Sequence, residues 1–477
     1  MSQVVAIIVL VLYTYTIIST IFVILLENRS PVRSFIWVLV LTLIPVFGFI
    51  LYLGIGRSYR RNKIYSKNAI SKLTHRPVAS FDIGTLDETQ FDADHLNLLK
   101  LLHNNNNATA YANNKIDLYP DGKKTFEAMF EAIRNAKEHI HVEFFIFEDD
   151  QISNKFKDLL IQKSKEGVRV RMIYDYLGSL KLARKKKYVK SLREAGVYVC
   201  SFLPLGVGLF RSKINHRNHR KLLIIDGKIG FTGGLNIADR YYYGDKLGMW
   251  RDTFVRLEGA AVHGLQMLFL IDWHFVDAKL ITDNKYFPTP KKFKTNIVQA
   301  VASGPDTDWE AIMQGIALAI MSANKYVYIQ TPYFIPTEVI LSCVQIAALS
   351  EVDIRIMIPM KSDTRFTQIG THSYLEEIMA AGVRVLRYTG GFLHSKAIVI
   401  DDFISIIGSA NMDERSYTQN FEANVFIYEE KTAQKLKTLF LDDSEKCEEL
   451  TLEEWNNSRK KKQKLQESII RLFSPML

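Results

Sequence analysis

Cysteine is scarce in this chain. The 477 residues include only three, Cys200, Cys343 and Cys447, and no two of them have the spacing of a pair. This excludes a disulfide framework and a zinc site built from cysteines, and it is typical of a reducing compartment. Charge is not scarce: 61 Lys and Arg against 51 Asp and Glu give a net charge of +10. Such an excess suits nucleic acid or anionic membranes, and composition alone does not separate the two.

Near the amino terminus, charge is absent. No charged residue occurs from Val4 to Leu26. As a helix this run is roughly 34 Å long, enough for a bilayer core of about 30 Å. A signal peptide is the alternative, but Ser2 and Gln3 provide no cationic segment, and no small-residue cleavage site follows. The run therefore predicts a membrane span.

A second apolar run extends from Phe35 to Ile55, in which Pro45 and Gly48 are irregularities that a membrane helix tolerates. We expect residues 1–56 to form a transmembrane hairpin with spans at about 4–26 and 35–55. The alternative is a hairpin buried in a soluble core.

Acidic residues are missing just after this hairpin. The stretch from Arg57 to Arg76 holds seven basic residues and no acidic one, whereas the connection between the runs has a net charge of only +1. The positive-inside rule therefore predicts a cytoplasmic catalytic domain in a multi-pass protein of the cell membrane. A polybasic stretch at this place also favours attraction to anionic lipid. Two further basic clusters, Arg184–Lys187 and Arg459–Lys462, are either solvated surface or lipid-binding.

One short motif occurs twice. His219-x-Lys221-x4-Asp226 recurs as His394-x-Lys396-x4-Asp401. An Asn follows each His at the same distance and ends a Gly-x-x-Asn sequence; these are Asn236 and Asn411. Two chance matches with a shared downstream residue are implausible, so we interpret the copies as two halves of one active site.

The residue types suit a phosphodiester. A His and a Lys two residues apart lie on one face of an extended strand, and each motif runs into an apolar stretch typical of a buried strand, Leu222–Ile225 and Ala397–Ile400. The ammonium groups neutralise phosphate oxygens, and the Asn amides can donate further hydrogen bonds. One His can attack phosphorus while the other protonates the leaving oxygen. This chemistry requires no metal or other cofactor.

The doubled motif resembles the phospholipase D superfamily, and the flanking segments narrow the resemblance to the bacterial cardiolipin synthases. Those segments cover essentially the whole chain: Glu27–Pro31, His141–Phe145, Asn215–His219, Trp250–Thr253, Thr331–Phe334 and Phe473–Pro475. The resemblance implies transfer of a phosphatidyl group from one phosphatidylglycerol to another, with release of glycerol through a covalent phosphohistidine. It favours His219 as nucleophile and His394 as general acid.

The resemblance also implies supporting roles for two acids, with Asp252 orienting His219 and Glu422 orienting His394; the alternative is two ordinary surface acids. Asp226 and Asp401 follow buried strands and precede turns, so we interpret them as structural supports and not as proton carriers. Ser409, which is Gly234 in the first copy, is either a phosphate donor or a small residue required by a tight turn. His141, His216 and His372 are left outside the site.

The repeat extends beyond the motifs and predicts the fold. Both halves have the pattern helix, strand, helix, strand and then motif strand, which indicates an α/β fold of two phospholipase D-like sandwich halves with mixed sheets behind the transmembrane hairpin. We expect a basic juxtamembrane connector at 57–113 with an exposed loop at Asn104–Asn107. The domain boundaries expected after it are a first half at 114–283, a linker at 282–294, a second half at 295–445 and a basic tail at 446–477.

The motif residues do not define which molecule accepts the phosphatidyl group. Water would make the enzyme a phospholipase D and serine a phosphatidylserine synthase, and a membrane-tethered nuclease or a non-enzymatic lipid-binding scaffold would use the same surfaces differently. We expect phosphatidylglycerol and anionic lipids as partners and no nucleic acid; the sequence does not define the oligomeric state. Two apolar segments, Phe202–Phe210 and Tyr241–Tyr243 with Met249 and Trp250, either fill the core or form a lip that enters the membrane interface.

Overall fold

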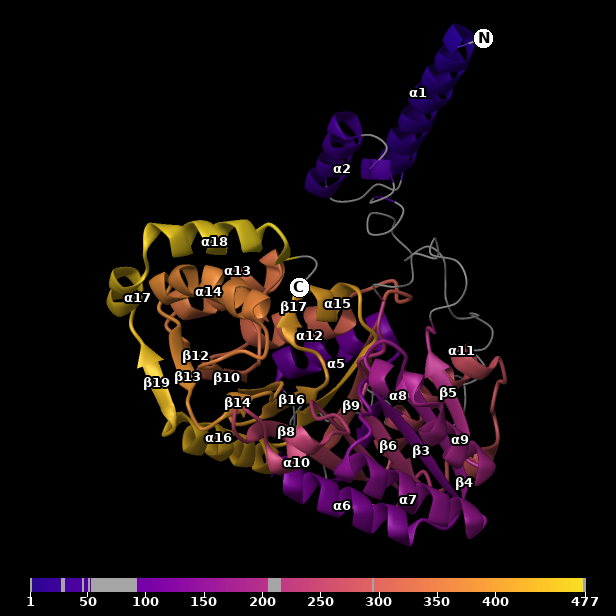
Figure 1. The fold of residues 1–477 in the computed structure, drawn as a ribbon. Helices are drawn as coiled ribbons and strands as arrows, with labels where there is room; N and C mark the ends of the chain where they lie inside the picture. Colours follow the sequence, from indigo (N-terminus) through magenta and orange to yellow (C-terminus); the bar gives the residue numbers. More distant parts are fainter. Residues whose placement is uncertain are drawn as a thin grey trace. The chain divides into compact units, whose positions relative to one another are not determined.

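The computed structural model describes residues 2–26, 31–44, 47–49, 52, 92–204, 216–293 and 296–474 (Figure 1). The chain divides into two compact units. One contains Met1–Lys63 and Leu205–His216, and the other contains Ile64–Pro204 and Arg217–Leu477. Both copies of the motif lie in the second unit.

The amino-terminal unit contains helices α1 (Ser2–Leu26) and α2 (Pro31–Leu43). Within the residues described, one helix, over Gln3–Phe22, is long and apolar enough to cross a membrane. The apolar part of α2, Ser34–Leu43, is shorter than a span, and much of the expected second span lies outside the described residues. One candidate span is therefore present, and the two-span hairpin is not established.

The first catalytic half is built around a mixed sheet in the order β14-β8-β7-β6-β3-β4-β5, with β2 paired to β8. Strands β3, β4 and β5 are parallel, whereas β6, β7 and β8 are antiparallel. The elements of this half are β2 (Lys115–Asp121), α6 (Gly122–Asn135), β3 (His139–Phe144), α7 (Gln151–Lys165), β4 (Arg169–Asp175), α8 (Leu180–Arg184), α9 (Lys186–Glu194), β5 (Tyr198–Phe202), β6 (Leu222–Ile225), β7 (Ile229–Gly233), α10 (Asp239–Tyr243), β8 (Trp250–Glu258) and α11 (Val262–Asp277).

The second half repeats this plan in a sheet of order β1-β9-β18-β16-β15-β10-β12-β13-β19, with the small pair β11-β17 beside it. Its elements are β9 (Ile297–Ser303), α12 (Ala311–Met321), β10 (Tyr326–Gln330), β11 (Phe334–Ile335), α13 (Glu338–Leu349), β12 (Asp353–Pro359), α14 (Arg365–Ala380), β13 (Arg384–Tyr388), β14 (Phe392–Leu393), β15 (Ala397–Ile400), β16 (Ile404–Gly408), β17 (Met412–Asp413), α15 (Glu414–Thr418), β18 (Glu422–Tyr428), α16 (Glu430–Ser444) and β19 (Cys447–Leu450). The tail continues as α17 (Leu452–Ser458) and α18 (Lys461–Arg471).

Local sequence explains where these elements begin. Asp121, Asp150, Thr337 and Thr364 precede α6, α7, α13 and α14, and each accepts a hydrogen bond from a backbone N–H in the first turn of its helix. Such caps satisfy amide groups that the helix itself leaves unpaired. The motif strands β6 and β15 are wholly buried runs of aliphatic residues, as expected.

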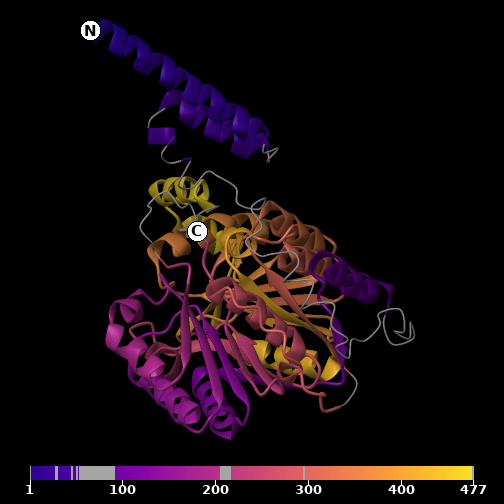
Figure 2. The ribbon, with the colours of Figure 1, turned by 90° about the vertical axis from the view of Figure 1, so that its right-hand side faces the viewer.

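The unit that contains both halves has three hydrophobic cores, one on the outer face of each sheet and one between the halves. Helices α6, α7 and α9 cover the outer face of the first sheet, and α5 (Ala93–Asn106), α12, α13 and α14 cover that of the second. The third core takes residues from both halves, including Leu222, Leu257 and Phe269 from the first and Val399, Val425 and Phe440 from the second. Figure 2 views the same arrangement from the side, with the first half in magenta and the second in orange and yellow. The junction of the halves is therefore a continuous core.

Backbone pairing also crosses the junction. Strand β14, which directly precedes the second His, pairs in parallel with β8 of the first half. Asn218, which directly precedes the first His, forms a parallel bridge with Phe421 at the start of β18. Each motif is thus fastened to a strand of the opposite half, and this decides the side-chain contacts in the site.

The repeated, mixed α/β fold is confirmed, with two differences in detail. A third helix–strand unit, α9–β5 and α14–β13, precedes each motif. The expected loop at Asn104–Asn107 is instead the end of α5, where Asn105 and Asn106 form hydrogen bonds to Gln314 and to the backbone of Ala302. Helix α5 and β1 (Ala110–Ala112) pack on the second half because Leu98, Leu99 and Leu102 are fully buried there. These leucines are interspersed with polar and charged residues, so the sequence of this stretch predicted a polar connector.

Candidate active site

The two motif histidines are held by backbone bonds to the opposite half. The N–H of His219 donates to the carbonyl of Phe421 at 2.9 Å, and that of His394 donates to the carbonyl of Arg251 at 2.7 Å. Each motif Lys folds back on its own His: Nζ of Lys221 and Nζ of Lys396 lie 2.5 Å from the carbonyl oxygens of His219 and His394. Each ammonium therefore donates one hydrogen to the backbone and has two left to donate to a bound anion.

The carboxylates that orient the histidines are exchanged between the halves. Nδ1 of His219 lies 2.8 Å from Oε1 of Glu422, and Nδ1 of His394 lies 2.7 Å from Oδ2 of Asp252. The expected pairing within each half, Asp252 with His219 and Glu422 with His394, is wrong. The cause is the strand pairing across the junction, which places the first residue of β18 beside one motif and β8 beside the other.

The two pairs are not equivalent. Glu422 also accepts hydrogen bonds from the Ser409 hydroxyl at 2.5 Å and from the Asn420 amide at 3.3 Å. The Ser409 hydroxyl thus donates its hydrogen to the Glu422 carboxylate. In the first half a Cβ on Gly234 would lie 2.5 Å from Oδ1 of Asp252, so no serine fits there.

Burial dominates the electrostatics of the site. It lowers the pKa of His219 to about 4 against the opposing effect of Glu422, and it lowers that of His394 well below its usual value. Burial also lowers the pKa of Lys396 to about 8, and that of Lys221 well below the usual range. Since removal from water disfavours these cations, an anion bound among them would be strongly favoured.

The two carboxylates respond differently. Burial raises the pKa of Asp252 to about 7 despite the nearby Lys396 ammonium. Burial acts in the same direction on Glu422, but His219, Lys221 and Ser409 outweigh it, so the pKa of Glu422 is lowered. Glu422 stays ionised at neutral pH, whereas the raised pKa of Asp252 brings the titration of that carboxyl close to neutral pH.

The motif aspartates lie behind the site. Asp226 accepts bonds from the backbone N–H groups of residues 137–139, and Asp401 from those of residues 324–326, at 2.5–2.9 Å. Both have positive φ, 56° and 49°, in the turn after β6 or β15. These contacts are of the kind expected for structural supports.

The two asparagines are placed beside the motifs, but with different partners. Asn236 accepts from the N–H of Ile146 at 3.1 Å and donates to the Tyr241 hydroxyl at 2.8 Å. The Asn411 amide opposes the rise that burial causes in the pKa of the Asp413 carboxylate. In the first half, the expected amide–phosphate bond can use only the second amide hydrogen of Asn236.

Aromatic rings that sequence reasoning did not assign enclose the imidazoles. Phe145 packs edge-on to His219 at 5.0 Å between ring centroids, and Tyr241 and Trp250 pack on His394 at 5.4 and 5.3 Å. Tyr241, Trp250 and Phe202 are buried. Of the two alternatives for these segments, core filling therefore holds for these three residues. Tyr243 and Met249 of the same segments are exposed, and Phe210 lies outside the described residues.

A second layer of buried charges supports the carboxylates and was also missed. Arg220 pairs with Asp272 and donates to the backbone carbonyl of Glu422. Arg251 pairs with Asp443 at 2.7 Å and donates to the carbonyl of Asp252 at 2.6 Å. The arginines could have been noticed because each is next to a site residue. Their acidic partners could not, because they are distant in sequence.

Two of the histidines left outside the site, His141 and His372, have contacts of their own elsewhere. His141 is fully buried, stacks on Phe269 and bonds Gln266, as expected for a core histidine. His372 packs against Trp455. Within the described ranges, no cluster of three or more His, Cys, Asp or Glu side chains is arranged to hold a metal ion.

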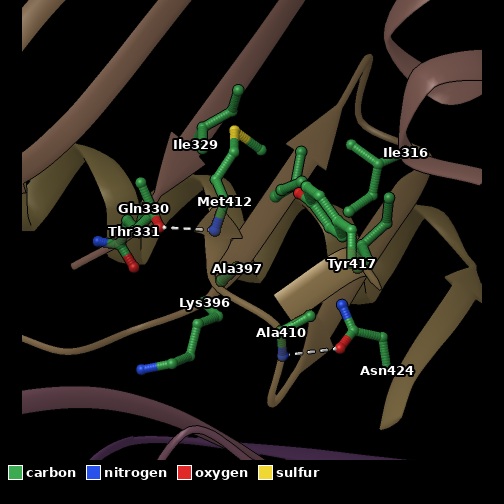
Figure 3. Close-up of a pocket in the computed structure, with 12 residues that line it drawn as sticks. Ile316, Ile329, Gln330, Thr331, Lys396, Ala397, Ala410, Met412, Tyr417 and Asn424 are labelled. Atoms are coloured by element: carbon green, nitrogen blue, oxygen red, sulfur yellow. Dashed lines mark hydrogen bonds between the residues drawn. The ribbon is translucent and has the colours of Figure 1, made fainter. Parts of the chain in front are cut away.

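A cavity of about 10 Å³ lies behind β15, lined by Ile316, Ile329, Met412 and Tyr417 among others. Figure 3 shows the Lys396 side chain extending away from these apolar residues. The volume is about that of a single water site, so this cavity is a packing gap and not a substrate site.

The duplicated α/β half with paired imidazole and ammonium groups at the junction defines the class, a two-half enzyme of phospholipase D type. Residues 129–247 and 316–444 match the family model described as "Cardiolipin synthase, PLD-like domain", and residues 11–57 match "Phospholipase_D-nuclease N-terminal". The chain is similar to "Cardiolipin synthase" of Halalkalibacterium halodurans, with 41% identity over 98% of this chain and 93% of the relative. It is 40% identical to "Major cardiolipin synthase ClsA" of Bacillus subtilis, over 98% of each chain.

The chain therefore belongs to the bacterial cardiolipin synthases of the phospholipase D superfamily, which are phosphatidyltransferases. Among solved structures it resembles phosphatidylserine synthase of Haemophilus influenzae, with a TM-score of 0.61 and 15% identity, covering 80% of this chain and 100% of that one. At that identity the likeness concerns the fold alone.

Proposed function

We propose that this enzyme joins two phosphatidylglycerol molecules into cardiolipin and releases glycerol, through a phosphatidyl group carried on His219. The family membership supports the reaction, and the pair of crossed imidazole–carboxylate contacts supports the mechanism. Because Glu422 and Asp252 each occupy an Nδ1, both imidazoles have only Nε2 left to act on a substrate.

In the first step Nε2 of His219 attacks phosphorus and the bond from phosphorus to the glycerol oxygen breaks. His394 gives its proton to that oxygen, so glycerol leaves neutral. The lysines stabilise the charge that develops on the phosphoryl oxygens. In the second step His394, now neutral, takes the proton of the incoming hydroxyl as its oxygen attacks phosphorus and the N–P bond breaks.

The unlike carboxylates support this division of roles. A carboxylate that stays ionised, as Glu422 does, stabilises the positive charge that a phosphorylated imidazole acquires. A carboxyl whose pKa is raised to about 7 and which is hydrogen-bonded to the imidazole, as Asp252 is to His394, suits a group that releases and recovers a proton in each cycle. The bound phosphodiester anion raises the proton affinity of His394 before the first step.

The proposal is tested by incubating detergent-purified protein with phosphatidylglycerol vesicles and analysing the lipids by mass spectrometry. Cardiolipin with an equal amount of free glycerol is the expected result. Phosphatidic acid alone would contradict it and identify water as the acceptor. Without lipid turnover the nuclease alternative would be examined with DNA, where binding must fall steeply with salt.

We also propose that residues 1–56 span the membrane twice and leave the catalytic halves in the cytoplasm, with boundaries as expected from the sequence. The helix over Gln3–Phe22 and the basic stretch after residue 56 support this. In a background without native cysteines, Ser30→Cys should react with an impermeant maleimide in intact cells, and Ser66→Cys only after lysis. The reverse pattern, or labelling of both, would contradict the two-span topology.

A further inference from the structure

The two halves have the same His and Lys residues but differ in the residues beside the motif Asn. We call this place, next to Asn411 in the second half, the corner of the site. Each half has a short parallel bridge just after its motif Asn, whose aromatic member is Phe147 in the first half and Phe334 in the second. The residue before it is Ile146 in one half and Tyr333 in the other. Phe334 is fully buried in the core of the second half, whereas Tyr333 is only half-buried: part of its side chain packs against the same core and the rest is exposed.

The Asn beside this corner also differs between the halves. In the first half, Oδ1 of Asn236 accepts a bond from the N–H of Ile146. In the second, Oδ1 of Asn411 is buried and has no hydrogen-bond partner within the part of the chain described, although Asn411 is only 8% exposed. The open atom is thus the amide oxygen, a hydrogen-bond acceptor.

A second acceptor lies at the same corner. The Tyr333 hydroxyl donates to Oδ1 of Asp363 at 2.7 Å, and the Asp363 residue is exposed to solvent. The N–H of Met412, the residue after Asn411, donates to the Thr331 hydroxyl at 3.2 Å, and that hydroxyl donates to the Tyr333 carbonyl at 2.7 Å. The charge of Asp363 also opposes the lowering of the Lys396 pKa by burial. The corner therefore adjoins the second motif.

These groups have the wrong polarity for phosphate and the right one for a polyol. The oxygens of a phosphodiester anion only accept hydrogen bonds, and so do Asn411 Oδ1 and the Asp363 carboxylate. These groups therefore cannot form hydrogen bonds with the phosphate. Hydroxyl groups donate, and the glycerol headgroup of phosphatidylglycerol carries free hydroxyls. An unpaired buried acceptor costs free energy until such a donor arrives.

We propose that Tyr333, Asp363 and Asn411 form a glycerol subsite that holds the headgroup hydroxyls beside His394. The subsite deepens the proposed function and rests on it. The leaving glycerol oxygen and the attacking hydroxyl occupy the same place opposite His219, because the second step reverses the geometry of the first. One subsite therefore serves both, and it distinguishes glycerol from water, which cannot reach several acceptors at once.

The test uses the full-length protein in detergent and free ¹³C-glycerol, whose incorporation into phosphatidylglycerol reports headgroup exchange. In Tyr333→Phe and Asp363→Asn the glycerol KM should rise about tenfold, in line with one lost hydrogen bond to a polyol. Hydrolysis of bis(p-nitrophenyl) phosphate, which has no glycerol, is measured in parallel and normalises for the amount of competent enzyme. Tyr328→Phe and Asp353→Asn are matched controls, since these residues form a similar pair at 2.9 Å on β10 and β12.

The possible outcomes separate the two proposals. A raised glycerol KM in the Tyr333 and Asp363 variants, with a smaller change in the headgroup-free hydrolysis, supports the subsite. An unchanged glycerol KM, or equal losses in both assays, overturns the subsite while the synthase reaction stands. Absence of exchange and of cardiolipin in the unsubstituted enzyme overturns the proposed function and the subsite with it.

Discussion

Replacing His219 or His394 with Ala is expected to lower cardiolipin formation by at least about 10⁴-fold, because a ping-pong transfer needs both groups in every cycle. The two variants should nevertheless differ in a covalent intermediate. With a donor whose leaving group is p-nitrophenolate, departure needs no acid. His394→Ala should then form the phosphoryl-enzyme on His219 and stall, since no base remains to activate the acceptor.

The adduct is measured by intact-mass spectrometry after an alkaline denaturing quench, because phosphorylated imidazoles decompose in acid. His219→Ala should show no adduct. His372→Ala is a matched control, as this partly buried His packs against Trp455 and makes none of the site contacts. An adduct on the His219 variant with none on the His394 variant would reverse the roles, and its absence from both would contradict a covalent mechanism.

Much of the fold follows from patterns that lie close together in the sequence. The motif strands are read from consecutive aliphatic residues, and the turns from the Asp that follows each strand. The structural role of Asp226 and Asp401 was predictable for the same reason, since a carboxylate after a buried strand meets nearby backbone amides. Helix α5 was not predictable from polarity, because its asparagines and charges surround only a few buried leucines.

The pairing of carboxylates with histidines was beyond local reasoning. Spacing places Asp252 after Asn236 and Glu422 after Asn411, which suggests a partner in the same half. The actual partners depend on which strand edge each motif joins, and this is settled by the shared core between the sheets. The buried pairs Arg220–Asp272 and Arg251–Asp443 escaped for the same reason, since neither acid lies near a motif.

Because Glu422 pairs with His219 and Asp252 with His394, replacing each carboxylate should impair the His of the opposite half. Pairing within each half would give the opposite assignment. Glu422→Gln should impair His219, because an amide no longer favours the tautomer that keeps Nε2 free or the cationic phosphorylated ring. Asp252→Asn should impair His394 in the same way. Loss of a carboxylate from such a pair costs up to about 10⁴-fold in rate, so both variants should lose about 10²-fold to 10⁴-fold of cardiolipin synthesis.

The donor with a p-nitrophenolate leaving group distinguishes the two variants. Glu422→Gln should behave as a nucleophile variant, with slow release of nitrophenolate and no accumulated adduct. Asp252→Asn should release a first equivalent quickly and accumulate the adduct, because its defect lies in activation of the acceptor. If the carboxylates served the histidines of their own halves, these outcomes would be exchanged.

A milder change tests the asymmetry of the two pairs. Ser409→Ala removes a donor that helps keep Glu422 ionised, without touching either imidazole. It should slow adduct formation by about tenfold, as expected for one lost bond to a charged group, and leave the breakdown of the adduct unchanged. An effect on breakdown alone would mean that Glu422 acts on the proton-transferring His, and the crossed assignment would fail. Asp353→Asn, which alters a carboxylate bonded to Arg355 on the surface of β12, is the control for a general effect of lost negative charge.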